Sequence, residues 1–303
     1  MPPDVAHALA RYALSLPSTG PLADERLGTV LGNVRLPNPI GLAAGYDKDG
    51  LLYDQFSRWG MGFYVVGSIT ARRRRPLPRP RLYRPRDGLW MLNAFGLPSE
   101  GVIPVSRRIN GVRVRVPIIS NVAGFSLSEF SVLIKAMDSL PQVSAIELNI
   151  SCPLFDDPAG MDELAMLSSR LTRKPSMIKL SPRHSGISVY NTIPVTTDLL
   201  GAGRGGMSGL PLYRRTLSAL ARIREVSDRI PLMAIGGIMT GVQVLEALEA
   251  GADAVQALTA VAFRGPVAFR RMSEELLEAM EAKGYRSVSE AKGYRSRALV
   301  SAD

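Results

Sequence analysis

The sequence predicts an α/β fold, a (β/α)8 TIM barrel. Eight short runs rich in Val, Ile and Leu recur along the 303 residues, and helical patterns separate most of them. Continuous apolar runs of this length are typical of parallel strands that are buried on both faces. Nearly every run ends in Gly, Asn or Ser, at the end of the strand where barrels carry their active sites. A doubly wound sheet is the alternative, and the number of runs favours the barrel.

The predicted elements alternate in chain order. The strands are PIGLAAG (39–45), FYVVGSIT (63–70), PIISNVAG (117–124), SAIELNIS (144–151), SMIKLS (176–181), ISVYNTI (187–193), PLMAIGG (231–237) and DAVQALTA (253–260). Helices are predicted where apolar residues recur three or four positions apart. These segments are 51–59, 126–137, 162–171, 213–226, 240–251 and 266–284.

Two segments depart from a regular barrel. Only PRHSG (182–186) separates the fifth strand from the sixth, and a parallel crossover normally needs a dozen residues or more. We therefore expect the fifth helix to be missing or reduced. Residues 4–16 form a short amphipathic pattern, which predicts an N-terminal helix that plugs the bottom of the barrel or touches a membrane surface. The expected organisation is one domain, 1–303, with an N-terminal helical extension over 1–20.

Composition narrows the function classes. One cysteine and two histidines make a zinc site improbable, so we expect no metal. One cysteine also fits a reducing cytoplasm, and no apolar run is long enough to span a bilayer. The net charge of +10 favours an anionic partner: RNA, a lipid surface, a phosphate cofactor or a carboxylate substrate. Eight arginines fall between Arg72 and Arg86, where a solvated loop is favoured over a nucleic-acid arm.

The predicted strand ends carry small and polar residues. Small residues after the first strand let a flat ligand approach the backbone. Lys179 lies inside an apolar run, so it needs an anionic or hydrogen-bonding partner. Glycine-rich turns are predicted at GRGGMSGLP (203–211) and at Gly236 and Gly237, and barrels bind phosphate through such turns late in the chain. Together these ends indicate a phosphate-bearing cofactor that lies across the barrel mouth.

With these residues in order, the chain resembles the dihydroorotate dehydrogenase family from about residue 4 to the end. The resemblance is carried by NPIGLAAGYDKDG, PRLYRPRDGLWMLNAFGLPSEG, NVAG, ELNISCP, IKLSP, YNT, GGMSGLPL, IGGI and LTAVAFRGP. It implies a flavin enzyme on a (β/α)8 barrel, with FMN as cofactor and dihydroorotate as substrate. The reaction would be the oxidation of (S)-dihydroorotate to orotate in pyrimidine biosynthesis.

The resemblance also implies two sets of binding residues. The residues expected to touch FMN are Ala44, Gly45, Tyr46, Asp47, Lys48, Ser68, Asn121, Asn149, Lys179, Tyr190, Gly209, Gly237, Leu258 and Thr259. The residues expected to hold the pyrimidine are Lys48, Asn93, Ala94, Phe95, Gly96, Leu97, Asn149, Asn191 and Thr192. Lys48 would balance the substrate carboxylate.

Cys152, the one cysteine of the chain, falls where this family places its catalytic base. The oxidation removes a proton from C5 and a hydride from C6 of dihydroorotate, and FMN accepts the hydride. The protein must then supply a base on the other face of the substrate. A thiol whose pKa is lowered by cationic neighbours can take this role.

The resemblance is mixed in ways that leave the electron acceptor open. AAGYDKDG and the N-terminal segment are similar to the membrane-associated, quinone-using class, which usually has a serine base, whereas the cysteine is similar to the soluble class. The acceptor is therefore quinone, fumarate, or NAD through a partner subunit. Leu154 and Ser99 stand where the family usually has asparagine, which leaves substrate choice open. The flank without a fifth helix is expected to be covered by a second protomer or an electron-transfer subunit.

Three other functions remain. One is another flavin reductase on this fold, similar to dihydropyrimidine dehydrogenase. The second is a tRNA dihydrouridine synthase, although that family lacks GGMSGLPL and adds an RNA-binding domain. The third is a non-catalytic nucleic-acid binder that uses the Arg72–Arg86 loop. We expect no nucleic-acid partner.

Overall fold

A seven-stranded parallel sheet forms the centre of the computed structural model, which describes residues 22, 24–86, 88–150, 158–179 and 192–292. Its strand order is β12-β13-β3-β4-β7-β8-β9. The strands are β3 (Ile40–Leu42), β4 (Phe63–Ile69), β7 (Ile118–Val122), β8 (Val143–Asn149), β9 (Ser176–Lys179), β12 (Met233–Ile235) and β13 (Ala254–Ala257). Each overlaps one of the predicted runs, so seven of the eight predicted strands are confirmed. The remaining run, 187–193, lies almost wholly outside the described residues.

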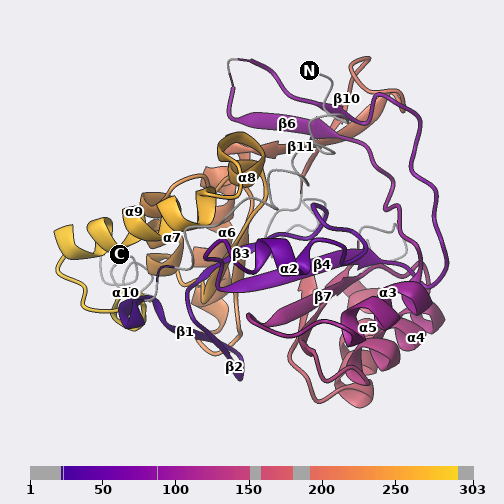
Figure 1. The fold of residues 1–303 in the computed structure, drawn as a ribbon, viewed down its shortest axis with the longest axis horizontal. Helices are drawn as coiled ribbons and strands as arrows, with labels where there is room; N and C mark the ends of the chain where they lie inside the picture. The colour runs from indigo at the N-terminus through magenta and orange to yellow at the C-terminus, as the bar shows by residue number, and fades with distance from the viewer. Residues whose placement is uncertain (1–21, 23, 87, 151–157, 180–191, 293–303) are drawn as a thin grey trace.

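Helices cover the outer face of this sheet (Figure 1). The helices are α2 (Tyr53–Phe56), α3 (Val102–Asn110), α4 (Leu127–Asp138), α5 (Pro158–Leu171), α6 (Tyr213–Val226), α7 (Gly241–Glu249), α8 (Thr259–Arg264), α9 (Ala268–Ala282) and α10 (Val288–Ala291), with short 3-10 turns η1 (Glu25–Leu27) and η3 (Leu210–Leu212). All six predicted helices have a counterpart, whereas α3, α8 and α10 were not predicted. Ser126 and Thr240 cap α4 and α7 by accepting from the backbone N–H three residues on.

Side chains that alternate along the strands build two cores. Outward residues such as Ile146 and Leu148 pack with helix residues such as Phe130 and Phe269 in the main core. Inward residues form a second cluster that fills the amino end of the strands. Its buried members are Leu31, Leu36, Phe63, Val65, Ile119, Ala145, Met233 and Ala254.

The amino end is closed by a hairpin that the sequence patterns did not reveal. Strands β1 (Thr29–Leu31) and β2 (Val34–Leu36) pair antiparallel, and Leu31 and Leu36 belong to the inner cluster. The predicted N-terminal helix over 4–16 lies outside the described residues, as does the PRHSG segment of the fifth crossover.

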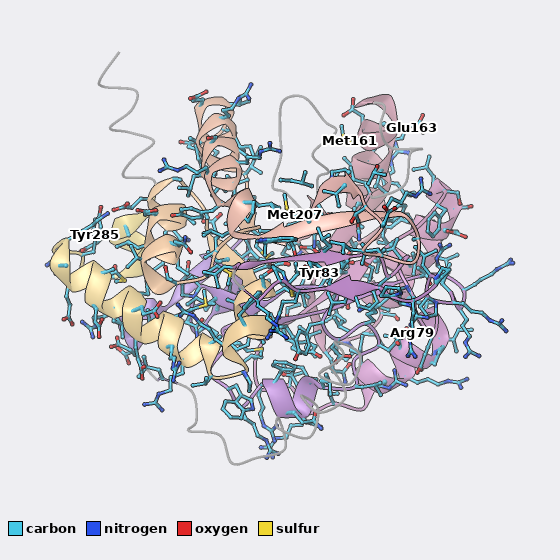
Figure 2. All side chains as sticks on the ribbon, turned by 90° about the horizontal axis from the view of Figure 1, so that it is seen from above. Arg79, Tyr83, Met161, Glu163, Met207 and Tyr285 are labelled. Carbon is cyan, nitrogen blue, oxygen red and sulfur yellow. The ribbon has the colours of Figure 1, made fainter. Side chains whose placement is uncertain are left out.

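A second, antiparallel sheet stands at the opposite end of the strands (Figure 1). Its order is β10-β11-β6-β5, formed by Ile193–Thr196, Arg204–Gly209, Trp90–Asn93 and Leu82–Tyr83. Most of the segment predicted as a glycine-rich turn, 203–211, is therefore strand β11. Its glycines serve close packing, because a Cβ at Gly205 would overlap Asn93 O on the neighbouring strand. Figure 2 shows this sheet from above, with Tyr83 and Met207 labelled on the strands that flank β6.

Candidate active site

The carboxyl ends of the parallel strands bring together the loops that the sequence analysis singled out. Asn121 pairs in register with Glu147, and Asn149 pairs with Lys179 on the next strand. Residues 43–48 follow β3, Gly236 and Gly237 follow β12, and Leu258 and Thr259 follow β13. All of these positions lie on one edge of one parallel sheet, where barrels and doubly wound sheets bind their ligands.

The loop after β3 is tied to β4 through backbone hydrogen bonds. Gly45 N donates to Gly67 O at 2.7 Å, and Gly67 N donates to Asp47 O at 3.1 Å. Gly45 has a φ of +103°, which a residue with a side chain rarely adopts. A Cβ at Gly45 would lie 3.7 Å from Leu258 Cδ1, so the loops after β3 and β13 are neighbours. Tyr46 packs edge-on against Phe56, with ring centroids 5.0 Å apart, and burial raises its pKa.

The Asp47 side chain is hydrogen-bonded to other groups of the protein. Its carboxylate accepts hydrogen bonds from Leu51 N at 3.0 Å, from Leu52 N at 2.7 Å and from the Tyr64 hydroxyl. Burial, followed by the charge of Asp47, raises the pKa of Tyr64 well above its ordinary value. The carboxylate therefore shapes the loop that carries Lys48, and the sequence motif alone did not distinguish this role from contact with a cofactor.

Replacing Asp47 by alanine is expected to lower the free energy of unfolding by about 3 kcal/mol, because buried donors lose their acceptor. Urea unfolding monitored by circular dichroism measures the change. Asp54 is the matched control: it is exposed and sits 3.4 Å from Arg115, so Asp54→Ala should cost no more than about 0.5 kcal/mol. Equal stability of the two variants would contradict the role assigned to Asp47.

The Lys48 side chain lies at the mouth of the site, where two neighbouring groups contact it. Its Nζ donates to Gly45 O at 2.5 Å and stands 4.2 Å from the centroid of the Phe95 ring. Burial lowers the pKa of Lys48 to about 8, against the opposing charges of Asp47 and Asp49. The structure thus brings together Lys48 and Phe95, which come from distant parts of the chain and were both predicted to hold the substrate.

This pKa gives an expected pH dependence for the binding of a carboxylate ligand such as orotate. Below pH 8 Lys48 is charged and can pair with the carboxylate; above pH 8 it loses its proton, so the dissociation constant should rise about tenfold per pH unit. Fluorescence titration with orotate from pH 6 to pH 10 measures this dissociation constant. The inflection should vanish in Lys48→Met, and an inflection kept by that variant would assign it to another group.

A polar layer lies directly above the inner apolar cluster. Glu147 follows Ala145 by two residues on β8, and Gln256 follows Ala254 by two on β13, so both project into the interior. Glu147 accepts from Asn121 Nδ2 through Oε1 and from Gln256 Nε2 at 2.5 Å through Oε2. Lys179 Nζ lies 3.6 Å from Glu147 Oε1, and these two side chains are 3% and 2% exposed.

Glu147 is therefore the partner that the sequence analysis required for Lys179. Sequence reasoning missed Glu147 because it treated 144–151 as one apolar run. The available signal was the alternation on β8, which places Glu147 on the same face as Asn149.

Two asparagines lie near this layer, and one of them has an unpaired acceptor among the described residues. Asn149 Nδ2 donates to Ser68 Oγ at 2.8 Å, which brings together two residues predicted to touch the cofactor. Asn121 Oδ1 is buried and has no hydrogen-bond partner among the described residues. Because buried polar atoms are nearly always paired, this oxygen is available to a donor from a bound molecule.

The turns after β12 and β13 form the opposite side of the site. Gly236 and Gly237 have φ values of +108° and +81°, and a Cβ at Gly237 would overlap the backbone of Tyr213 at the start of α6. Thr216 Oγ1 donates to Gly236 O at 2.9 Å and fixes the turn. Thr259 begins α8, and its hydroxyl lies 3.4 Å from Ser208 Oγ on β11. Of the two glycine-rich segments predicted as turns, Gly236–Gly237 lies outside a strand, whereas most of 203–211 is β11.

The predicted substrate segment, 93–97, leaves the antiparallel sheet. Asn93 Nδ2 donates to Gly206 O at 3.3 Å, and Thr192 packs against the same glycine, so these two predicted residues are neighbours. Ala94 is buried in the small core of this sheet, while Gly209 ends β11 against the backbone of Leu89. Gly96 and Leu97 both have positive φ, 75° and 53°, and for Leu97 that conformation is strained.

The arginine-rich segment packs on this substrate segment. Residues 72–80 are exposed, as expected for a solvated loop. Leu77 N donates to Phe95 O at 3.0 Å, and Arg74 and Ser99 exchange backbone hydrogen bonds of 2.9 and 3.3 Å. The Ser99 hydroxyl accepts from Gly101 N at 3.1 Å and from Thr70 N at 3.4 Å. Ser99 therefore anchors this loop to the end of β4.

Three predicted site residues fall outside the described residues, namely Cys152, Tyr190 and Asn191, and so does Leu154. Within the described ranges, no group of three or more His, Cys, Asp or Glu residues is placed to hold a metal ion. The described helices also include none that is long and apolar enough to cross a membrane.

Comparisons with known proteins agree on one family. The family model for dihydroorotate dehydrogenase matches residues 26–199 and 183–280. A curated protein of Cereibacter sphaeroides, named dihydroorotate dehydrogenase (quinone), is 31% identical over 332 residues, covering 96% of this chain and 93% of that protein. The Thermus thermophilus protein of the same name is 30% identical over 335 residues, covering 95% and 96%.

Solved structures support the fold. The crystal structure of DHODH in complex with ferulenol from Eimeria tenella superposes with a TM-score of 0.85 at 21% identity, covering 97% of this chain and 96% of that chain. The ligand-free structure of DHODH from the same organism superposes with a TM-score of 0.86. This similarity confirms the predicted α/β barrel fold.

Proposed function

The chain belongs to the dihydroorotate dehydrogenase family, and from that premise we propose that it oxidises (S)-dihydroorotate to orotate with bound FMN and with Cys152 as the base. Two contacts carry the proposal: Lys48 stands over the Phe95 ring, and Asn149 is in register with Lys179 at the carboxyl ends of β8 and β9. They occur in a chain whose relatives carry that enzyme name over nearly their full length.

The residues present fit a flavin. The buried Asn121 Oδ1 without a partner among the described residues is an acceptor for a ring N–H, and Lys179 is a cationic donor in the same layer. The turns at Gly236–Gly237 and at Leu258–Thr259 offer backbone N–H groups for the phosphate. When bound, FMN supplies the acceptor for the hydride. Because the family is flavin-dependent, a flavin is the expected cofactor, and we propose that this flavin is FMN.

The protein itself holds the substrate and moves the proton. We assign the substrate carboxylate to Lys48, whose ammonium is partly desolvated beside Phe95. Asn93, Thr192 and Asn149 provide amides and a hydroxyl for the neutral edges of the pyrimidine, without competing for the proton. Cys152 follows Asn149, the last residue of β8, by three positions, and its thiolate would take the proton from C5.

We propose a quinone as the electron acceptor, because the curated relatives from Cereibacter sphaeroides and Thermus thermophilus both carry that acceptor in their names. Turnover with a soluble quinone, with fumarate and with NAD distinguishes the three acceptors. Reduction of the quinone alone supports the proposal, whereas turnover with fumarate alone would contradict it.

We also propose that residues 1–303 form a single domain, and that a second protomer or an electron-transfer subunit covers the flank beside the 182–186 segment. Sedimentation tests the second point. A monomer that captures no partner would count against it.

The identity of the cofactor and of the product tests the whole proposal. Denaturing the purified protein should release FMN in a ratio near one per chain, and incubation with dihydroorotate and a quinone should yield orotate, identified by chromatography. A colourless protein that binds RNA in a salt-sensitive manner would instead support the nucleic-acid binder.

A further inference from the structure

Glu147 is a buried carboxylate for which the proposed reaction supplies no role. It lies on β8 inside the barrel and contacts side chains from three other strands, β7, β9 and β13. Its own side chain is 2% exposed. Burial of a charged group at this depth is costly unless it is paired and hydrogen-bonded, so the arrangement calls for an explanation.

Both carboxylate oxygens of Glu147 contact neighbouring polar side chains. Oε1 accepts from Asn121 Nδ2 and lies 3.6 Å from Lys179 Nζ, while Oε2 accepts from Gln256 Nε2 at 2.5 Å. Both oxygens are therefore acceptors.

The contacts also link Glu147 to two residues that we assign to the flavin. Asn121 and Glu147 are in register on neighbouring strands, and so are Asn149 and Lys179. Glu147 lies two residues before Asn149, one layer deeper in the barrel. Glu147 therefore contacts Lys179 and Asn121, two residues that we assign to the flavin.

We propose that Glu147 is a positioning residue that holds the Lys179 side chain toward the flavin, and that it thereby sets the reduction potential of the flavin. This inference rests on the proposed function, because it requires that a flavin is bound. On reduction the ring system gains negative charge, which a nearby ammonium stabilises. Without Glu147 the buried Lys179 side chain loses its anionic partner and turns toward another acceptor, which leaves less positive charge at the ring.

The test is the reduction potential of Glu147→Gln, measured anaerobically against reference dyes. The glutamine side chain has nearly the same shape as glutamate, and rotation of the Gln256 amide offers it the Oε1 of Gln256, which has no partner among the described residues. We expect the variant to bind reduced flavin about tenfold more weakly relative to oxidised flavin, which lowers a two-electron potential by about 30 mV. An unchanged or raised potential would overturn the inference, because Lys179 would then keep its charge and place without Glu147.

Two controls separate this effect from a general loss of structure. Glu147→Asp keeps the carboxylate, so the flavin potential in this variant should lie closer to that of the unmodified protein than the potential in Glu147→Gln does. Glu249→Gln removes another buried carboxylate that pairs with a lysine, Lys283 at 2.6 Å, on a helix outside the barrel interior. It should lower stability and leave the potential unchanged.

A second variant covers the case in which Glu147→Gln does not fold. Glu147→Gln combined with Gln256→Glu keeps the net charge and the hydrogen bond but moves the carboxylate to β13, away from Lys179. Its potential should also fall, and a potential equal to that of the unmodified protein would overturn the inference. If the unmodified protein binds no flavin, the proposed function fails; if it binds flavin and the potentials do not respond, only the role of Glu147 fails.

Discussion

Replacing Cys152 by alanine is expected to slow the reduction of the bound flavin by dihydroorotate by a factor of about 10²–10⁴, the usual contribution of a general base. The variant should still purify as a yellow protein, because Cys152 is not among the residues assigned to the flavin. Loss of the base removes the acceptor for the C5 proton, so the hydride cannot leave C6 at the normal rate. Stopped-flow absorbance under anaerobic conditions measures the rate.

Cys152→Ser is the matched variant. A serine hydroxyl has a much higher pKa than a thiol, so this variant should be slow at neutral pH and recover part of the rate as pH rises. Flavin reduction in Cys152→Ala at the rate of the unmodified protein would remove Cys152 from the mechanism.

Replacing Lys48 by methionine is the second change with a large expected effect. Methionine has a similar length without the charge, so the substrate carboxylate would enter a partly buried site with no cation to pair with. Loss of one partner of such a pair costs about 3 kcal/mol, which corresponds to a roughly hundredfold weaker binding of orotate. Titration of the flavin absorbance with orotate measures the dissociation constant.

Lys135→Met is the control, because Lys135 is exposed on α4 and lies outside the candidate site. It should bind orotate as the unmodified protein does. If Lys48→Met also binds orotate normally, the carboxylate is held by another group, and the assignment of Lys48 to the substrate is wrong.

The sequence was most informative where one physical signal acts along a continuous segment. Buried parallel strands need apolar residues on both faces, so β4, β7 and β8 are recognisable as uninterrupted runs. Helix α6 occupies the predicted residues, 213–226, and α4 begins after a serine cap. These elements depend mainly on local pattern.

Elements that depend on distant partners were harder to predict. Strand β11 is rich in glycine and resembles a turn, and it forms a strand only because β6 and β10 pair on either side of it. The hairpin of β1 and β2 is short, and its leucines are buried only by the inner face of strands far along the chain.

In the candidate site, too, some roles could be predicted from the sequence and others depend on contacts between distant residues. Motifs predicted that Lys48 and Phe95 would serve one ligand, and the structure places them 4.2 Å apart. Motifs could not show that the Asp47 carboxylate is occupied by Leu51 and Leu52, nor that Glu147 is the partner of Lys179. Such roles follow from which atoms meet in three dimensions, and residue type alone does not determine them.

The most direct test of the account is to purify the protein, exclude oxygen, add dihydroorotate and record the flavin absorbance. The account predicts a yellow protein whose absorbance near the flavin maximum is lost on addition of the substrate, with the formation of orotate. A yellow protein whose absorbance does not change with dihydroorotate would contradict the assigned substrate. Leu154 and Ser99, which stand where the family usually has asparagine, would then indicate a different substrate.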